Sequence, residues 1–451
     1  MRTEYRNGEP QIARHYAVIG SGVAGLSAAW LLAQHHRVTL FEADGRPGGH
    51  SNTVLAPTGD TLTPVDTGFI VFNERNYPNL TALFEHLGVK TQRSDMSFAA
   101  SLDGGRLEYS SDGLNGLLGQ RSNSVSLRFW TMVRDIWRFY SEAPKVVKSV
   151  SAERMTLGEF LDANNYSAAF VEDHLLPMGA AIWSTTAKQM RDYPLVAFVR
   201  FFVHHGLLDL IGRPNWRTVS GGSIKYVQAM LSRIGEVRCG AGVAQVLRER
   251  GGATVVDVHG QREHFTDVVI ATHADEALKL LGDADEQERR LLGAFAYTDN
   301  EAVLHSDTEL MPKRQGVWAS WNYIGETCGD GDRPLCVTYW MNRLQNLDTA
   351  HPLFVTLNPT REIATEKVIK RFHYSHPLFN RAAIEAQQHL WRLQGHRRTW
   401  FAGSYFGAGF HEDALQSGLA AAEGAGDVRR PWRVAGESDR IVLAPMLEAA
   451  E

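Results

Sequence analysis

The run Tyr16-Ala-Val-Ile-Gly-Ser-Gly-Val-Ala-Gly-Leu-Ser-Ala-Ala-Trp-Leu-Leu32 joins a short apolar segment to three closely spaced glycines. Its first four residues suit a buried parallel strand, and the small residues after the glycines suit a helix. A second apolar run, Val38–Phe41, leads into Glu42, about 20 residues after the first glycine. This order of strand, turn, helix, strand and acid predicts a Rossmann-type turn that holds the pyrophosphate of a dinucleotide. An ordinary glycine turn is the alternative, but it requires neither the second strand nor the acid.

Each glycine of the motif has a separate role at such a turn. Gly20 permits the tight bend, Gly22 lets the backbone approach a phosphate, and Gly25 lets the helix pack closely on the strand. The free N–H groups and the positive dipole at the helix N-terminus then face the phosphates. The residues assigned to this turn and to the ribose are Gly20, Gly22, Val23, Ala24, Gly25, Glu42 and Ala43.

A second glycine pair follows in Arg46-Pro-Gly-Gly-His50. It would bring another backbone segment to the pyrophosphate, which nicotinamide enzymes do not usually need. This R-x-G-G run resembles that of FAD enzymes in the flavin amine oxidase and phytoene desaturase superfamily. The resemblance implies tightly bound FAD. The FAD is expected to be non-covalent, because no cysteine resembles the one that the family uses for covalent attachment.

Later segments match the same superfamily in the same order. Val65-Asp-Thr-Gly-Phe69 resembles a segment that passes under the flavin ring, and without the family it would be a strand with a glycine bulge. A helix that begins near Ala414 resembles the one whose N-terminal dipole stabilises reduced flavin. The glycine pair in Trp216–Gly222 resembles the point where the chain re-enters the FAD domain. The resemblance assigns FAD contacts to Arg46, Gly48, Gly49, His50, Thr67, Gly68, Phe69, Val243, Ala271, Thr272, Gly403, Ser404, Asp413, Ala414 and Leu415.

We expect an α/β fold with more than one domain, because 451 residues exceed one ordinary compact unit. The resemblance implies a Rossmann-like FAD-binding domain built from discontinuous segments, with a second α+β substrate-binding domain that carries a mixed sheet and helices. The FAD-binding segments are 1–75, 214–275 and 396–430, and the substrate-binding segments are 76–213 and 276–395, with a helical part at about 115–213. The tail, 431–451, is charged and contains proline, so we expect it to be poorly ordered.

Residues 126–142 form the clearest amphipathic helix of the sequence. Apolar side chains, among them Trp130 and Trp137, fill one half of its circumference, and Arg134 and Asp135 lie on the other. Such a helix either packs on its own domain or lies in a membrane interface with its tryptophans at the level of the lipid headgroups.

The composition argues against several classes of function. The net charge of −5 gives no electrostatic case for nucleic acid. The three cysteines form no C-x-x-C pair and suggest no disulfides, which favours a cytoplasmic setting. The His204-His205 pair has no further ligand at a metal spacing, so we expect no metal site. No signal peptide or membrane span is predicted. Peripheral contact with the inner face of the membrane stays open, and so does the oligomeric state.

Further pieces resemble one bacterial branch of flavoproteins that is associated with enzymes modifying unsaturated acyl chains of lipids. These pieces are Tyr339–Gln345, Leu357–Pro359, His376-Pro377 and Gly409–Asp413. The run 194–212 is strongly apolar, and its default interpretation is a core helix. The four pieces and this run together favour an FAD-dependent dehydrogenase or desaturase that acts on an apolar acyl chain or lipid. Its reaction would be hydride transfer from a substrate C–H bond to flavin N5. The candidate residues near the substrate are Trp183, Tyr339 and His411.

Two alternatives remain open. A flavin amine oxidase would release hydrogen peroxide, and a non-enzymatic FAD-holding partner protein would never be reduced by a donor. Two departures put amine oxidation in doubt. His50 stands where amine oxidases have an arginine after the glycine pair, and no residue can be matched to the lysine that aids the reaction of reduced flavin with oxygen. Lys313 lies in roughly the corresponding region, but in a polar loop context.

Overall fold

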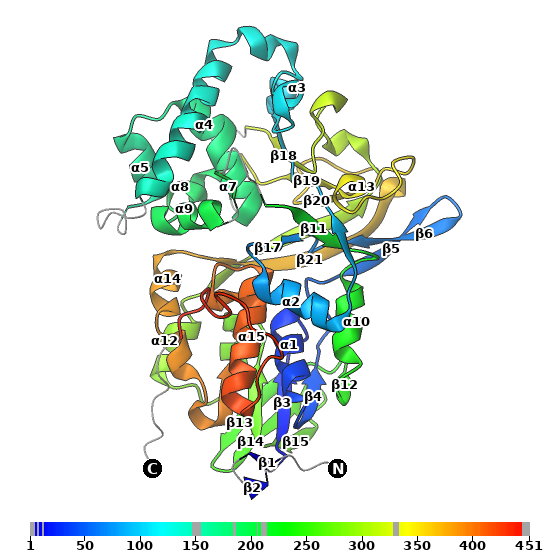
Figure 1. The fold of residues 1–451 in the computed structure, drawn as a ribbon, viewed down its shortest axis with the longest axis vertical. Helices are drawn as coiled ribbons and strands as arrows, with labels where there is room; N and C mark the ends of the chain where they lie inside the picture. Colours follow the sequence, from blue (N-terminus) through cyan, green and yellow to red (C-terminus); the bar gives the residue numbers. More distant parts are fainter. Residues whose placement is uncertain are drawn as a thin grey trace.

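The computed structural model describes residues 5–6, 9–10, 13–146, 155–183, 186–204, 206–208, 214–327 and 333–443. His205, Cys328 and the end of the apolar run 194–212 lie outside these ranges. A parallel sheet lies at one end of the long axis, and a mixed sheet with a helical part lies at the other (Figure 1).

A five-stranded parallel sheet is built around the glycine motif. Its central strand is β3 (His15–Ile19), and its order is β12-β4-β3-β16-β22. The neighbours are β4 (Arg37–Phe41), β12 (Glu236–Arg238), β16 (Asp267–Ile270) and β22 (Thr399–Phe401). All four pairings are parallel. The predicted α/β fold with a Rossmann-like sheet made from discontinuous segments is therefore confirmed.

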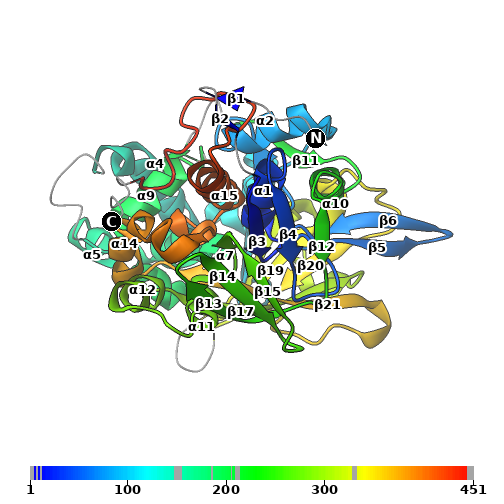
Figure 2. The same cartoon turned by 90° about the horizontal axis from the view of Figure 1, so that it is seen from below.

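Helices cover one face of this sheet and a small antiparallel sheet covers the other (Figure 2). The helices are α1 (Val23–Leu32), α10 (Ile224–Leu231) and α15 (His411–Gly426), and α2 (Pro78–Leu87) packs on α10 and α15. The antiparallel strands are β13 (Val243–Glu249), β14 (Gly252–Asp257) and β15 (Arg262–Phe265). A parallel sheet covered on both faces needs apolar strands throughout, which explains the continuous run at Tyr16–Ile19.

A seven-stranded mixed sheet forms the other part of the molecule, in the order β10-β9-β18-β19-β20-β17-β21. Among the described strands of this sheet, only β9 and β18 pair in parallel. Its strands are β9 (Phe98–Leu102), β10 (Leu107–Ser110), β17 (Ala296–His305), β18 (Trp321–Gly325), β19 (Val337–Trp340), β20 (Phe354–Leu357) and β21 (Val368–Leu378). Short pairings complete the strands: β1 (Tyr5–Arg6) with β2 (Glu9–Pro10), the hairpin β5 (Thr53–Thr58) with β6 (Thr61–Asp66), and the sheet β7 (Phe72–Asn73)-β11 (Trp216–Val219)-β8 (Thr91–Arg93).

The helical part packs against one end of the mixed sheet (Figure 1). It comprises α3 (Gly113–Leu117), α4 (Leu127–Val146), α5 (Leu157–Ala163), α6 (Ala168–Phe170), a π-helix (Val171–Leu175), α7 (Leu176–Trp183), α8 (Ala187–Arg191) and α9 (Leu195–His204). The core interpretation of the apolar run is confirmed for α9, which buries Leu195, Phe198, Val199 and Phe202 completely. The other helices are α11 (Ala274–Leu280), α12 (Glu286–Leu292), α13 (Met341–Leu344) and α14 (Arg381–Gln387). Within the described ranges, no helix combines the length and the apolar character that crossing a bilayer requires.

The helix predicted at 126–142 is α4, but its two faces differ from the prediction. Asp135, expected on the polar half, is fully buried and accepts a hydrogen bond from the backbone N–H of Ser167 at 2.9 Å. Trp130 and Trp137, expected on the apolar half, are 46% and 61% exposed. The two tryptophans stay exposed because the face of α4 that packs against the domain is narrower than the half of the helix that its apolar residues occupy. The buried residues of α4 are Phe129, Met132, Asp135, Phe139, Tyr140 and Ala143.

The expectation of a poorly ordered tail is wrong for residues 431–443, and residues 444–451 lie outside the described ranges. Trp432 stacks on Trp30 of α1, with 5.9 Å between the ring centroids. Arg440 pairs with Asp413 at the start of α15 at 3.2 Å. The charge that suggested disorder is therefore used in contacts that hold this segment against α1 and α15.

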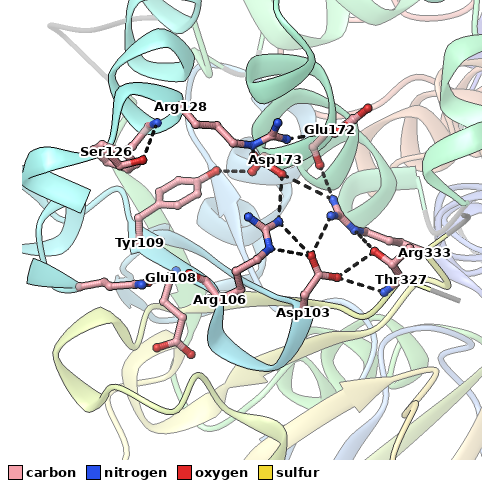
Figure 3. Close-up of polar contacts among 12 residues, drawn as sticks. Asp103, Arg106, Glu108, Tyr109, Ser126, Arg128, Glu172, Asp173, Thr327 and Arg333 are labelled. Carbon is pink, nitrogen blue, oxygen red and sulfur yellow. Dashed lines mark hydrogen bonds and ion pairs between the residues drawn. The ribbon is translucent and has the colours of Figure 1, made fainter. Parts of the chain in front are cut away.

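An ion-pair network joins the helical part to the mixed sheet (Figure 3). Asp173, on the π-helix, is fully buried, and its Oδ2 accepts a hydrogen bond from Nε of Arg128 on α4 at 2.7 Å. Arg106 and Arg333 each approach its other oxygen at 3.8 Å. Both arginines also pair with Asp103, which follows β9, at 2.9 and 3.2 Å. The network thus ties together segments that are far apart in the sequence.

Arg128→Met should lower the free energy of unfolding by about 3 kcal/mol, because it removes the closest cation from a buried carboxylate. Arg381→Met is the matched control, since Arg381 and Glu385 form a pair that is 80% and 67% exposed. An exposed pair contributes less than about 1 kcal/mol. Urea unfolding followed by circular dichroism measures both variants. Equal losses would show that Asp173 does not depend on Arg128.

Candidate active site

Two glycine turns meet at the N-terminus of α1. Gly20 has a φ of 96°, and a Cβ on Gly25 would lie 1.8 Å from the Gly20 carbonyl oxygen. A Cβ on Gly49 would lie 3.0 Å from the Cα of Gly22, so the second glycine pair touches the first. Gly22 caps α1 without a side chain, and a Cβ there would meet no atom of the described residues within 4 Å. The helix terminus therefore opens onto free space, as a pyrophosphate site requires.

The ends of two further strands border this turn. A Cβ on Gly20 would lie 2.8 Å from the carbonyl oxygen of Ala271 and 3.4 Å from the Cγ2 of Thr272. β22 runs beside β16 and leads to Gly403, which is buried and is followed by the turn that begins at Ser404. The structure therefore brings together residues from three of the segments that the family resemblance assigned to FAD.

α15 packs directly on α1, backbone against backbone. A Cβ on Gly418 would lie 2.1 Å from the carbonyl oxygen of Ala24. The first turn of α15 contains Asp413, whose oxygens accept a hydrogen bond from the N–H of Phe410 at 2.8 Å and pair with Arg440. This carboxylate is therefore engaged within the protein rather than free. The next two residues of the turn, Ala414 and Leu415, are buried.

Glu42 lies at the end of β4, beside the glycine motif. Its Oε2 accepts hydrogen bonds from the N–H of Ser21, at 3.0 Å, and from the Ser21 hydroxyl. A Cβ on Gly242 would lie 3.5 Å from the Cβ of Ala43, which brings Val243 at the start of β13 next to this acid. The arrangement suits a carboxylate that accepts from a ribose hydroxyl.

Asp66 holds the chain in position at this site. It was not among the predicted FAD contacts, although it begins the run Asp66-Thr-Gly68. Its carboxylate accepts hydrogen bonds from Thr53 Oγ1 (2.6 Å), from the N–H and hydroxyl of Ser223 (2.9 and 2.8 Å) and from Gln345 Nε2 (3.0 Å). β6 ends at Asp66, so these bonds fix the point where the chain leaves the hairpin. Burial outweighs the hydrogen bonds and raises the pKa of Asp66 to about 6.

The segment after Asp66 lies against His50. Thr67 donates a backbone hydrogen bond to the carbonyl oxygen of Asn52 at 2.9 Å, and Phe69 donates one to the carbonyl oxygen of His50 at 2.7 Å. A Cβ on Gly68 would lie 2.3 Å from that His50 oxygen. Only glycine therefore allows the two backbone segments to meet here.

Aromatic and imidazole rings surround this junction. The ring of His411 stacks on that of Phe69, with 3.8 Å between the ring centroids, and the Nε2 of His411 is 2.8 Å from the hydroxyl of Tyr226. The ring of His50 stacks on Tyr374 at 4.8 Å and lies 5.4 Å from His376. The structure thus places the candidate His411 and the predicted FAD contacts His50 and Phe69 in one cluster. Tyr226, which lies on α10, was not predicted, because no local pattern marks it, whereas His376 belongs to one of the pieces that resemble the bacterial branch.

Burial keeps the imidazoles of this cluster uncharged. It lowers the pKa of His411 to about 3 and that of His376 to about 4. It also lowers the pKa of His50 well below its ordinary value, with a further contribution from the neighbouring His376. At neutral pH these side chains therefore act as hydrogen-bonding groups without a positive charge.

Two buried nitrogen atoms near the glycine turns are available to bind a ligand. Nη1 of Arg46 and Nε2 of His50 have no hydrogen-bond partner among the described residues. With the open terminus of α1 at Gly22, these atoms fit a bound FAD, which they would hold at the pyrophosphate and near the ring system. FAD, when bound, supplies the two-electron acceptor for the reaction.

A family comparison agrees with this geometry. The model of the family described as flavin containing amine oxidoreductase matches residues 23–304, which is more than half of the chain. The chain belongs to that family. Membership of this family makes the chain an FAD-dependent oxidoreductase.

Individual proteins resemble part or most of this chain. The bifunctional protein MnmC of Acinetobacter baylyi, named for tRNA 5-methylaminomethyl-2-thiouridine biosynthesis, is 42% identical over 64 residues, 14% of this chain and 10% of that protein. The chain thus spans about a tenth of the length of the curated relatives it matches. A fatty acid isomerase from P. acnes has the same fold, with a TM-score of 0.63 and 16% identity over 91% of this chain and 97% of that one. Putrescine oxidase has a TM-score of 0.65 and 15% identity over 92% and 99%.

The other candidate residues lie on other elements of the fold. Trp183 is packed among aromatic rings of the helical part and contacts Phe201 at 4.7 Å. Tyr339 lies on β19, in edge-to-face contact with Trp321 at 4.9 Å. Lys313 donates its backbone N–H to Glu108 at 2.8 Å, beside the turn between β9 and β10. Its side chain lies against that same turn, near Gly105.

Gly22→Ala should lower the affinity for FAD by about tenfold or more, because the new methyl group fills the space open to the pyrophosphate. The apoprotein should lose no more than about 1 kcal/mol of stability, because alanine is a poorer helix N-cap than glycine but nothing described in the fold contacts that space. Gly235→Ala is the matched control, because its Cβ also meets no described atom within 4 Å. FAD titration and thermal melting of the apoprotein test the pair. Unchanged FAD binding by Gly22→Ala would contradict the assignment.

Asp66→Asn should change how stability depends on pH. The pKa of Asp66 is raised in the folded chain, so its contribution to stability is full below the unfolded pKa and is lost as the pH rises through about 6. The stability of the wild type relative to Asp66→Asn should therefore fall by about 3 kcal/mol between about pH 4 and pH 7. Chemical unfolding across this range measures the difference. A pH-independent difference would show that Asp66 is not shifted.

Proposed function

We propose that this flavoenzyme removes two hydrogens from an apolar acyl-chain substrate, as a dehydrogenase or desaturase. FAD, when bound, would supply the two-electron acceptor, and it would take up the hydride from one carbon and, by way of solvent, the proton lost from the neighbouring carbon. The observation that carries the proposal is the uncharged, aromatic character of the cluster around His411. The substrate class follows from this character, because uncharged aromatic side chains bind apolar groups.

The imidazole rings of the cluster offer no charge of their own to a charged substrate at neutral pH. His411, His376 and His50 are neutral because burial lowers each pKa. The nearby carboxylate of Asp413 is already paired with Arg440. A protonated amine or a carboxylate taken from water into such surroundings would lose hydration without compensation, whereas an alkyl chain loses nothing. The electrostatics therefore favour an uncharged reacting segment over an amine.

Aromatic rings continue from the cluster into the helical part. Phe410, which precedes His411, stacks on Phe201 at 4.5 Å. Phe201 contacts Trp183, which in turn lies 5.4 Å from Phe198. Apolar side chains of this kind match the surface of an acyl chain. The protein of the same fold from P. acnes is a fatty acid isomerase, which is in keeping with an acyl substrate.

The test is anaerobic mixing of the FAD-loaded protein with candidate donors. We expect an unsaturated fatty acid or phospholipid to bleach the visible absorbance of oxidised flavin. Mass spectrometry should find a product lighter by two hydrogen atoms. Putrescine and an L-amino acid serve as the donors for the rival activity, and they should leave the absorbance unchanged.

Two outcomes would overturn the proposal. Bleaching by an amine, with hydrogen peroxide released in air, would assign the chain an amine oxidase activity. Absence of bleaching by every acyl donor, with dithionite still reducing the flavin, would exclude acyl oxidation.

A further inference from the structure

Exposed apolar side chains gather at one tip of the molecule. Ten large apolar residues are exposed among the described residues, and five of them lie between positions 114 and 137. The tip consists of α3, the turn Arg121–Val125 and the start of α4, at the end of the molecule farthest from the parallel sheet (Figure 1). The five residues, named here the tip patch, are Leu114 (73% exposed), Val125 (86%), Leu127 (84%), Trp130 (46%) and Trp137 (61%).

The helical members of the tip patch form one outward stripe. Leu127, Trp130 and Trp137 are spaced by three and seven residues, which places them on the same side of a helix. The opposite side of α4 supplies the core of the helical part, so packing does not account for the outward stripe. Trp130 is held in place by its indole N–H, which donates to the carbonyl oxygen of Ser124 at 2.9 Å. Large apolar side chains held outward in this way are typical of a contact surface.

The charge around the tip patch is positive although the whole chain is acidic. Residues 113–146 contain five lysines and arginines and two acidic residues, whereas the net charge of the chain is −5. Three of the five cations are paired with acids: Arg134 with Asp135 at 2.9 Å, Arg138 with Glu142 at 3.2 Å, and Arg128 with Asp173 at 2.7 Å. The other two, Arg121 and Lys145, supply the positive charge of this region. Arg121, in the turn before α4, and Lys145, in the last turn of α4, are both exposed. Tryptophan and leucine beside such cations match an interface between acyl chains and anionic headgroups.

Ion pairs hold the tip in a fixed position on the rest of the molecule. The network of Figure 3 fixes the start of α4 to the π-helix through Arg128 and Asp173, and fixes both to the mixed sheet through Arg106. A rigid mount means that the tip patch is presented without loss of conformational entropy on contact.

We propose that the tip patch docks this protein on the surface of an anionic lipid bilayer. Leu127, Trp130 and Trp137 enter the boundary between headgroups and acyl chains, and Arg121 and Lys145 face the lipid phosphates. A second copy of this chain suits the patch less well, because a symmetric contact would bring two positive surfaces together. Docking goes beyond the proposed function and does not depend on it, since a membrane-bound enzyme can act on any substrate.

Co-sedimentation tests the proposal with the FAD-loaded full chain and vesicles of phosphatidylcholine with or without phosphatidylglycerol. We expect binding only to the anionic vesicles. Trp130→Ser with Trp137→Ser should weaken it by about tenfold or more, because the interfacial apolar area is lost. Leu55→Ser with Leu62→Ser is the matched control, since both leucines are about as exposed but lie on the β5–β6 hairpin elsewhere on the molecule (Figure 1). This control should bind as the wild type does.

A charge series separates the electrostatic part of binding. Arg121→Gln with Lys145→Gln should weaken binding to the anionic vesicles by about 30-fold, because each interfacial cation contributes about a fivefold factor. Arg289→Gln with Arg290→Gln, two exposed cations on α12, should have no such effect. Flavin content and circular dichroism check that every variant remains folded.

Three results would overturn docking. The first is a wild type that does not bind anionic vesicles, and the second is equal binding by the tryptophan variant and its leucine control. The third is a wild type that sediments as a dimer without lipid and becomes a monomer in the tryptophan variant, which would assign the tip patch to self-association. None of these readouts depends on turnover of an acyl substrate, so docking and the proposed function can fail separately.

Discussion

Close contact between backbone segments at glycines is the constraint on which this structure depends. A Cβ on Gly25 would lie 1.8 Å from the carbonyl oxygen of Gly20, and one on Gly418 would lie 2.1 Å from that of Ala24. The first contact lets α1 pack closely on the turn after β3, and the second lets α15 pack closely on α1. Real Cβ atoms cannot approach so closely, because the repulsion exceeds any compensating packing energy. The same closeness leaves the N-terminus of α1 open at Gly22, where a pyrophosphate can be held by N–H groups.

Hydrogen bonds to one buried acid then organise the ring cluster. Asp66 fixes the end of the β5–β6 hairpin, and the next residues run directly against His50. His50 and His411 are thereby enclosed by rings and lose their positive charge through desolvation. Stability and chemistry are coupled at this point, because the residues that hold the chain in place also make the surroundings of the cofactor uncharged.

The helical part has two sides with different physical roles. Its inner side buries aromatic side chains that continue toward Phe410 and His411, and the buried Asp173 joins it to the mixed sheet through arginines. Its outer side exposes tryptophan and leucine in a positively charged region. An amphipathic pattern alone does not distinguish these roles, because a helix with a wide apolar sector fits a core contact and an interface equally well.

The family resemblance of several segments implied FAD. The amino-acid sequence alone was enough to predict the α/β fold, the glycine turns at Gly20–Gly25 and Gly48–Gly49, and the binding of a dinucleotide. These features depend on local backbone geometry and short spacings, which a linear sequence records directly. Other features came only from tertiary contacts. They include the role of Asp66, the meeting of His50 with His376 and His411, the ordered segment 431–443, and the outward direction of Trp130 and Trp137. Each of these depends on residues far apart in the chain, whose burial and charge are determined by neighbours that no local pattern identifies.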